Sequence, residues 1–401
     1  MKFAHMSDLH IGGWQEDTLR QVNMESFRRA IDICINEKVD FILFAGDIFN
    51  TSIPQIELLK ETTSILKKLK ENWIPVYTIA GSHDFSPSGK TMLDVLERAG
   101  LLINVFKSKD NKLLFTVDQK TGAKITGILG RRSGLERLDY EELDIKSLES
   151  EPGYKIFMFH TAIEELKPKD YGEIELIGLS VLPKNFNYYA GGHVHYILQK
   201  EYGNGMLTYP GALYPNNFKE LEEFKHGGFY IVEENSIRRV EIPIKEVIPL
   251  RFDVSNKDPS EVTSIVQNEV SRYDIKDKIV LLRIFGSLRS GKPSEINFKE
   301  IMAGLNDAYC VLKNTAKLSS AEFIEIKADY GNVAEVEQRV VHQSLDSLKL
   351  LEIPLEEEER LVLSLMKSID LEKAEGEKSS DFEKRVFSEA SSVLNISSLF
   401  E

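Results

Sequence analysis

The chain opens with Met1-Lys2-Phe3-Ala4-His5-Met6-Ser7-Asp8-Leu9-His10, an apolar run that leads directly into an Asp-x-His pair. The run has the length and the residue types of a β-strand. In α/β proteins, ligands bind where loops converge at the carboxyl ends of the strands. These ten residues therefore predict a strand that carries a carboxylate and an imidazole to a binding site.

Further apolar runs of strand length occupy residues 41–45, 76–80 and 156–159. Between them, apolar residues recur at helical spacing over residues 55–70 and 91–99. Strands that alternate with helices indicate an α/β fold. We therefore expect the polar residues that follow each strand to gather at one edge of a sheet.

Polar segments follow these strands and hold five of the eight histidines of the chain. Carboxylates and imidazoles are suitable ligands for manganese, iron or zinc. In an extended loop, the alternate residues of Asp-x-His and His-x-His point to the same side. The segments are Ser7-Asp8-Leu9-His10, Ala45-Gly46-Asp47-Ile48-Phe49-Asn50, Ala80-Gly81-Ser82-His83-Asp84, Phe159-His160 and Gly191-Gly192-His193-Val194-His195.

Each segment by itself has a simpler interpretation, since an Asp-x-His pair is commonly a turn and a single histidine is commonly a core residue. All five together predict a site for two metal ions. One carboxylate, that of Asp47, can bridge two ions about 3.5–4 Å apart, which activate water and stabilise the leaving oxygen of a phosphodiester. The expected ligands are Asp8, His10, Asp47, His160, His193 and His195.

The order of these segments is similar to that of the calcineurin-like metallophosphoesterase superfamily. Within it, the chain most resembles the archaeal DNA double-strand-break-repair nucleases of the meiotic recombination eleven family. The resemblance is carried by residues 1–10, Gly46-Asp47-Ile48-Phe49, the Gly-His-Val-His block at 192–195 and Tyr209-Pro210-Gly211-Ala212. It implies an α/β fold with a two-sheet αββα-sandwich phosphoesterase domain over 1–245, a small α+β capping domain over 246–330 and a C-terminal helical arm over 331–401.

The resemblance also implies a role for each site residue. His83 would protonate the leaving oxygen or hold the scissile phosphate, a role that suits an imidazole near neutral pH. The metal would be manganese, with two ions per subunit. One ion would be held by Asp8, His10, Asp47 and His195, and the second by Asp47, Ser82, His160 and His193.

For activity and partners, the resemblance implies manganese-dependent 3'-to-5' exonuclease cleavage of duplex DNA ends and endonuclease cleavage of single strands. A coiled-coil ABC-type ATPase would bind the C-terminal helices. Helices at 55–70 and 91–99 would pair two subunits into a homodimer, although their apolar faces could equally well cover the sheet.

Two positions depart from the family pattern. Ser82 stands where an Asn usually offers its carbonyl to the second metal, and a Ser hydroxyl is a shorter and weaker ligand. Asn50 stands where many members have a second His, and it can hydrogen-bond a phosphate but cannot transfer a proton. We therefore expect the second metal to be bound more loosely.

The C-terminal part of the chain is charged and helical in pattern. After a connector at 243–249, a small α+β domain is expected to end near Asp329. Two amphipathic helices follow, with apolar faces within residues 361–369 and 382–394, joined by a hydrophilic loop. Such a pair is either a docking arm for a partner or an ordinary pair of surface helices, and periodicity does not separate the two.

The net charge of the chain argues against DNA as the substrate, whereas some of its basic residues could contact DNA. A net charge of −14 is unusual for a protein that binds nucleic acid. The basic residues Arg131, Arg132 and Arg289 are candidate contacts to the DNA backbone, although each could be a solvated charge.

No apolar run spans a membrane, no leader peptide is recognised, and the two distant cysteines suggest a reducing, cytoplasmic setting.

Two other functions compete with that of a DNA-repair nuclease. A phosphoesterase for a small molecule or a phosphoprotein would fit the acidic balance but not the cap and the arm. A DNA-end scaffold without catalysis would fit the changes at Ser82 and Asn50. Such a scaffold would have no chemical need for the remaining metal ligands.

Overall fold

The computed structural model describes residues 1–85, 91–109, 112–131, 136–167, 176–234, 236–321, 341, 345, 355–371 and 379–394. The chain forms two compact units, Met1–Ser320 and Ala321–Glu401. The first unit contains both the phosphoesterase-like part and the small α+β part. The finer domain boundaries at 245 and 330 stay predictions.

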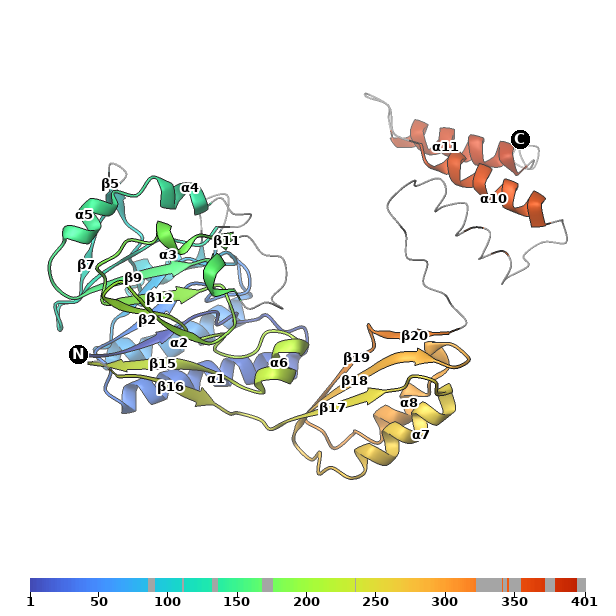
Figure 1. Ribbon diagram of the computed structural model, residues 1–401, viewed down its shortest axis with the longest axis horizontal. Helices are drawn as coiled ribbons and strands as arrows, with labels where there is room; N and C mark the ends of the chain where they lie inside the picture. The colour runs from blue at the N-terminus through green and yellow to red at the C-terminus, as the bar shows by residue number, and fades with distance from the viewer. Residues whose placement is uncertain are drawn as a thin grey trace. The chain divides into compact units, whose positions relative to one another are not determined.

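Two six-stranded sheets form the first part of this unit (Figure 1). The first has the order β16-β15-β1-β2-β3-β4, with β1 to β4 parallel and β15 and β16 antiparallel. Its strands are β1 (Lys2–Met6), β2 (Phe41–Ala45), β3 (Val76–Ile79), β4 (Ile103–Asn104), β15 (Gly227–Glu233) and β16 (Ser236–Ile242).

The second sheet has the order β13-β14-β12-β9-β8-β7. Strands β8, β9, β12 and β14 are parallel to one another, and β7 and β13 form antiparallel edges. Its strands are β7 (Thr116–Val117), β8 (Lys124–Gly127), β9 (Lys155–His160), β12 (Tyr188–Gly192), β13 (Leu198–Tyr202) and β14 (Gly205–Tyr209).

Successive side chains of a strand point to opposite faces of the sheet, and in the central strands the side chains on both faces are mostly apolar. One face can therefore pack against the other sheet. In β1, Phe3 lies in the core between the sheets, whereas Ala4 lies in the core beneath the helices. In β9, Met158 lies between the sheets, whereas Phe157 and Phe159 lie on the outer face. Both faces of the central strands are buried, and the layers form the expected αββα sandwich.

Helices cover the outer face of the first sheet (Figure 1). Helix α1 (Asp17–Asn36) contributes Phe27 and Ile31, and α2 (Ile56–Glu71) contributes Leu66 and Leu69. Other elements of this part are α3 (Met92–Arg98), α4 (Glu136–Glu141), α5 (Ile145–Ser150), α6 (Phe218–Phe224), the 3-10 turns η1 (Glu164–Leu166) and η2 (Leu179–Val181), and the short strands β5 (Ser108–Lys109), β6 (Lys112–Leu113), β10 (Ala162–Ile163) and β11 (Leu176–Ile177).

The small α+β part, called the cap below, begins at β17, so the expected connector at 243–249 ends inside a strand. Four strands and two helices enclose a separate core that includes Leu250, Val266 and Leu282. The elements are β17 (Val247–Asp253), α7 (Pro259–Val270), β18 (Ile279–Leu288), the 3-10 turn η3 (Pro293–Glu295), α8 (Phe298–Ala303), β19 (Cys310–Asn314) and β20 (Leu318–Ser320).

The second unit contains the two expected amphipathic helices, α10 (Leu355–Ile369) and α11 (Ser379–Val393). They pack against each other. Several of their apolar side chains are exposed, namely Met366, Ile369 and Phe387, as is Leu394 directly after α11. Among the described residues, no helix has the length and apolar character needed to cross a membrane.

Candidate metal centre

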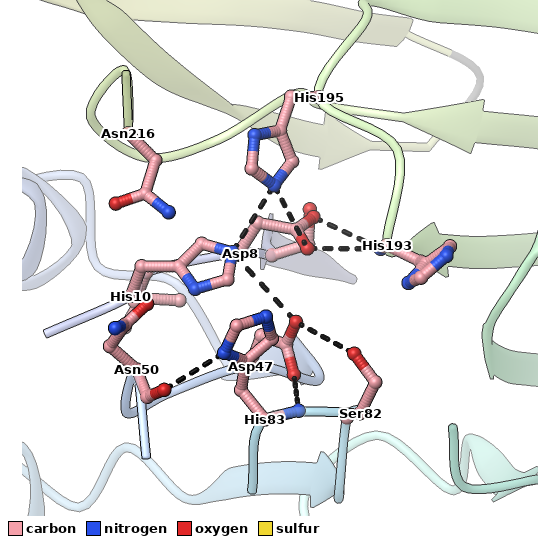
Figure 2. Close-up of polar contacts among 12 residues, drawn as sticks. Asp8, His10, Asp47, Asn50, Ser82, His83, His193, His195 and Asn216 are labelled. Atoms are coloured by element: carbon pink, nitrogen blue, oxygen red, sulfur yellow. Dashed lines mark hydrogen bonds and ion pairs between the residues drawn. The ribbon is translucent and has the colours of Figure 1, made fainter. Parts of the chain in front are cut away.

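Loops from both sheets converge at the carboxyl ends of five strands. Asp8 and His10 follow β1, Asp47 follows β2, and Ser82 and His83 follow β3. In the second sheet, His160 is the last residue of β9, and the turn that carries His193 and His195 follows β12. The segments do gather in one place, as expected, but they come from the edges of two sheets and not from one edge of a single sheet (Figure 2).

The backbone of these loops differs from the expected extended form. Four of the expected ligand residues have positive φ: Asp8 (52°), His10 (41°), Asp47 (52°) and His193 (83°). Left-handed backbone is costly for residues with a Cβ and persists only where the surroundings impose it. Here the loops after β1 and β2 run side by side, with the His10 amide donating to the Asp47 carbonyl at 3.0 Å.

The donor atoms of three trios lie within 4.8 Å of one another: Asp8, His10 and His195; His10, Asp47 and His83; and Asp8, Asp47 and His160. The Nε2 atoms of His10 and His195 are 3.2 Å apart, and Figure 2 shows the two rings facing each other. His160 Nε2 lies 3.2 Å from Asp47 Oδ2. Asp8 and Asp47 are fully buried or nearly so.

The hydrogen bonds of His160 and His195 leave Nε2 as the ligand atom. His160 Nδ1 donates to the Ala45 carbonyl at 2.7 Å, and its buried Nε2 has no hydrogen-bond partner. His195 Nδ1 donates to Glu220 Oε1 at 2.9 Å. In a neutral imidazole with Nδ1 protonated, Nε2 carries a lone pair, and a carboxylate on the other nitrogen is the usual second partner of a metal-bound histidine. The residues therefore fit a divalent metal ion.

The candidate ligand histidines differ in protonation, and a metal ion would have to displace the proton from His160 Nε2. Burial lowers the pKa values of His10 and His193 to about 4, so both rings are neutral near pH 7. Burial would lower the pKa of His160 too, but the neighbouring Asp47 carboxylate outweighs it and raises that pKa to about 9. The position of His160 Nε2 thus favours a positive charge, which a divalent cation also provides.

Glycines allow the two sheets to approach around His160. A Cβ on Gly192 would lie 2.0 Å from the Ala45 carbonyl oxygen and 2.8 Å from His160 Nδ1. A Cβ on Gly46, where φ is +89°, would lie 2.2 Å from the same nitrogen. Neither position has room for a side chain, so these glycines keep His160 in contact with the loop after β2.

His83 is held beside the cluster by two hydrogen bonds. Its amide donates to Asp47 Oδ1 at 2.8 Å, and its Nδ1 donates to the carbonyl of Asn50, also at 2.8 Å (Figure 2). A carbonyl can only accept, so Nδ1 carries the proton and Nε2 is free to exchange one. In this structure Asn50 acts on the site through its backbone.

Ser82 and His193 are placed differently from the other expected ligands. The buried Ser82 hydroxyl donates to Asp47 Oδ2 at 3.4 Å. The His193 amide donates to Asp8 Oδ1 at 3.0 Å, and its ring belongs to none of the three trios among the described residues. The roles of both residues as metal ligands stay predictions.

The candidate DNA-contacting arginines have partners within the protein or fall outside the described residues. Arg131 makes a bidentate pair with Asp139, at 2.7 and 3.0 Å. Arg289 pairs with Asp258 and Glu261 in the cap. Arg132 lies outside the described residues.

Sequence reasoning missed the supporting roles of Asp84 and Glu220. The buried Asp84 carboxylate accepts from the amides of Ile48, Phe49 and Gly81, at 3.0–3.1 Å, and so ties the loop after β2 to the loop after β3. Burial, followed by the nearby Asp47 carboxylate, raises the pKa of Asp84 to about 6. Asp84 stood inside a recognised segment, whereas no pattern in the sequence linked Glu220 to His195.

Comparison with known proteins identifies the family. Residues 1–196 match the family model described as calcineurin-like phosphoesterase. The chain is 30% identical over 356 residues to the DNA double-strand break repair protein Mre11 of Methanocaldococcus jannaschii, covering 83% of this chain and 90% of that protein. The chain belongs to the Mre11 family.

Other Mre11 proteins match over similar lengths. That of Sulfolobus acidocaldarius is 25% identical, over 92% of this chain and 98% of its own length. That of Archaeoglobus fulgidus is 24% identical, over 85% of this chain and 80% of its own length. Together with the clustered carboxylates and histidines, the match to the phosphoesterase and Mre11 families makes the chain a metal-dependent phosphodiesterase, as expected from its motifs.

Proposed function

We propose that this protein is a manganese-dependent nuclease that processes DNA ends in double-strand-break repair, working in the cytoplasm. The observation that carries the proposal is the buried His160 Nε2, which has no hydrogen-bond partner and faces Asp47 within a cluster contributed by two sheets. The name shared by the relatives, DNA double-strand break repair protein, supports DNA as the substrate. The free cysteines Cys34 and Cys310 agree with a reducing compartment.

Two manganese ions are assigned to the site. The first would be held by Asp8, His10 and His195, which form the trio that contains the two neighbouring Nε2 atoms, together with Asp47, which belongs to the other two trios. The second is held by Asp47, Ser82, His160 and His193. Of these, His160 has the strongest support, since its ring is oriented by the Ala45 carbonyl and its Nε2 lies 3.2 Å from Asp47 Oδ2, whereas His193 rests on the sequence pattern.

The protein's own groups would divide the chemistry between them. Bound metal ions would supply an activated water and neutralise charge on the phosphate. His83 Nε2 is the ring atom available for proton transfer, because Nδ1 is committed to the Asn50 carbonyl; Nε2 would donate to the leaving oxygen after taking up a second proton on the ring. Asp84 holds the loops that carry Asp47 and His83, and the Asn50 side chain is a candidate contact to the substrate phosphate.

The proposed reactions are 3'-to-5' exonuclease cleavage of duplex ends and endonuclease cleavage of single strands. Arg131, Arg132 and Arg289 are the candidate contacts to the DNA backbone. For Arg131 and Arg289, a phosphate would have to compete with the carboxylates that now pair with them. This competition makes DNA binding less favourable. If Arg131 contacts a phosphate, the slope of log DNA affinity against log salt concentration is expected to be smaller for Arg131→Gln.

A phosphoesterase for another phosphodiester or a phosphomonoester is the second candidate, favoured by the net charge of −14. Linear duplex DNA with manganese separates the two functions, with a 3'-blocked duplex and a small phosphodiester as controls. Cleavage of the unblocked duplex supports the repair nuclease. Turnover of the small phosphodiester alone would refute it, and DNA binding without cleavage would instead favour a scaffold.

The proposed partner is a coiled-coil ABC-type ATPase that binds α10 and α11. The exposed apolar residues Met366, Ile369 and Phe387 give these helices a surface that a partner could cover. Charge substitution at Phe387 is expected to abolish co-purification with the ATPase while leaving manganese binding unchanged. Retention of the ATPase by Phe387→Glu would refute this surface.

A homodimer is proposed through the outer ends of α2 and α3. Most of their apolar residues cover the sheet, as the simpler interpretation held, but Ile56 at the start of α2 is 77% exposed and Val95 of α3 is 52% exposed; Ile53, just before α2, is 74% exposed. Light scattering on Ile56→Glu is expected to give a monomer, with the exposed Ile265→Glu of α7 as a matched control that stays dimeric. A dimeric Ile56→Glu protein would contradict the assignment.

A further inference from the structure

The short helix α6 carries two acidic residues that point to different parts of the unit. Glu220 Oε1 accepts from His195 Nδ1 at 2.9 Å, and its Oε2 accepts from the Asn216 amide at 2.8 Å. Glu222, only two residues away, is buried and pairs with the cap. One rigid turn of helix therefore lies between the candidate metal ligand and the cap.

The contact between Glu222 and the cap is extensive. Arg283 of β18 donates from Nε and Nη2 to both carboxylate oxygens, at 2.9–3.2 Å. Arg251 of β17 lies at 2.8 Å from each oxygen through the same two nitrogens. Two guanidinium groups thus bind one buried carboxylate, a geometry that fixes position as well as charge.

Apolar packing reinforces this contact. Leu221, between the two acidic residues, is fully buried in a cluster with Val247 and Leu281 of the cap. The Phe218 ring lies 4.8 Å from the Arg283 guanidinium carbon. The cap therefore holds α6 on one side, while α6 holds the His195 ring on the other.

We propose that Glu222 is a positioning residue for the metal centre: its ion pairs with Arg251 and Arg283 hold α6 where Glu220 orients the His195 ring. This proposal rests on the proposed function only in taking His195 as a metal ligand. It follows that displacement of the cap from α6 weakens metal binding. A carboxylate on the second nitrogen of a ligand histidine fixes both its tautomer and its orientation.

The test measures Mn²⁺ affinity of the full chain by calorimetry, without substrate. Glu220→Gln is expected to weaken Mn²⁺ binding about tenfold, the lower end of the losses at outer-shell partners of metal ligands. Glu222→Gln is expected to weaken it less, by a few-fold, because Glu222 acts only through Glu220. Glu269→Gln removes an exposed Glu–Arg ion pair, with Arg272 in the cap, and is expected to leave affinity unchanged. A purely structural role for Glu222 would lower the melting temperature of the metal-free protein but not its Mn²⁺ affinity.

A double variant tests whether Glu222 acts through Glu220. If it does, Glu220→Gln with Glu222→Gln binds Mn²⁺ no more weakly, within about twofold, than Glu220→Gln alone, because coupled residues give non-additive effects. Independent, multiplying losses would overturn the proposal, as would wild-type affinity in Glu222→Gln. If Glu222→Gln does not fold, Arg251→Gln takes its place, since the Arg251 side chain is 62% exposed.

The two proposals fail in different ways. Wild-type protein that binds Mn²⁺ but does not cut DNA would refute the nuclease while leaving the role of Glu222 to be decided by affinity. Wild-type affinity in the Glu222 variants, with normal DNA cleavage, would refute only the positioning role. Unchanged Mn²⁺ binding in His195→Ala would refute the ligand assignment and the positioning role together.

Discussion

His10 and His195 stand 185 residues apart in the sequence, yet their Nε2 atoms lie 3.2 Å from each other. Two lone-pair-bearing nitrogens at that distance repel unless a proton or a cation lies between them. Burial lowers the pKa of His10 to about 4, whereas at His195 burial is outweighed by Asp8 and Glu220, which raise its pKa well above the ordinary value, so without a metal a proton on His195 can bridge the two atoms. A divalent cation bound by both rings would take the place of that proton and accept both lone pairs.

Metal binding should therefore stabilise the fold. At a Mn²⁺ concentration 100 times the dissociation constant, each site adds about 2.7 kcal/mol to the free energy of unfolding. Thermal unfolding with Mn²⁺ and with a chelator is expected to show a higher Tm with the metal. In His195→Ala the rise should be smaller, and an equal rise would contradict the ligand role of His195.

His83→Leu should lose catalysis but keep the metals. Removing a general acid costs about 10²–10⁴-fold in rate. His83→Leu loses the ring's bond to Asn50 but keeps the backbone amide that donates to the candidate ligand Asp47. We expect kcat on duplex DNA to fall by that factor with Mn²⁺ affinity unchanged. Full activity would exclude the role, and loss of a metal would make His83 a ligand.

Ser82→Asn should tighten the second metal site. The Ser82 hydroxyl now donates to Asp47 at 3.4 Å, whereas an Asn carbonyl reaches further and offers a better ligand oxygen. Nuclease rate measured against Mn²⁺ concentration is expected to reach half its maximum at a several-fold lower concentration. Ser82→Ala serves as the control for loss of the hydroxyl. An unaltered metal requirement in Ser82→Asn would reject the idea that Ser82 weakens the site.

Gly192→Ala should disrupt the contact between the sheets. Its Cβ would lie 2.0 Å from the Ala45 carbonyl oxygen, which accepts the His160 hydrogen bond. Overpacking of this kind costs about 1–3 kcal/mol. Chemical denaturation is expected to show that loss, together with weaker Mn²⁺ binding. Gly178→Ala is a matched control, because its Cβ would meet nothing closer than 3.7 Å.

Much of the fold could be predicted from the chain because its signals are local. Strands 41–45 and 76–79, and helices over 56–71 and 92–98, appear where apolar periodicity placed them. Periodicity did not show that the outer residues of α2 and α3 stay exposed, because burial depends on the neighbouring element. It also did not show that the expected connector at 243–249 ends in a strand, since pairing with β18 decides that.

The sequence by itself determined which donors this protein offers and that they lie at strand ends, because strand length, residue type and side-chain alternation are properties of short segments. Tertiary structure decided how those donors are used. The left-handed backbone of Asp8, His10 and Asp47, the three amides bound by Asp84 and the support of His195 by Glu220 depend on contacts between distant loops. Only the packed sheets and the cap bring these groups together, since their partners lie tens to hundreds of residues away along the chain.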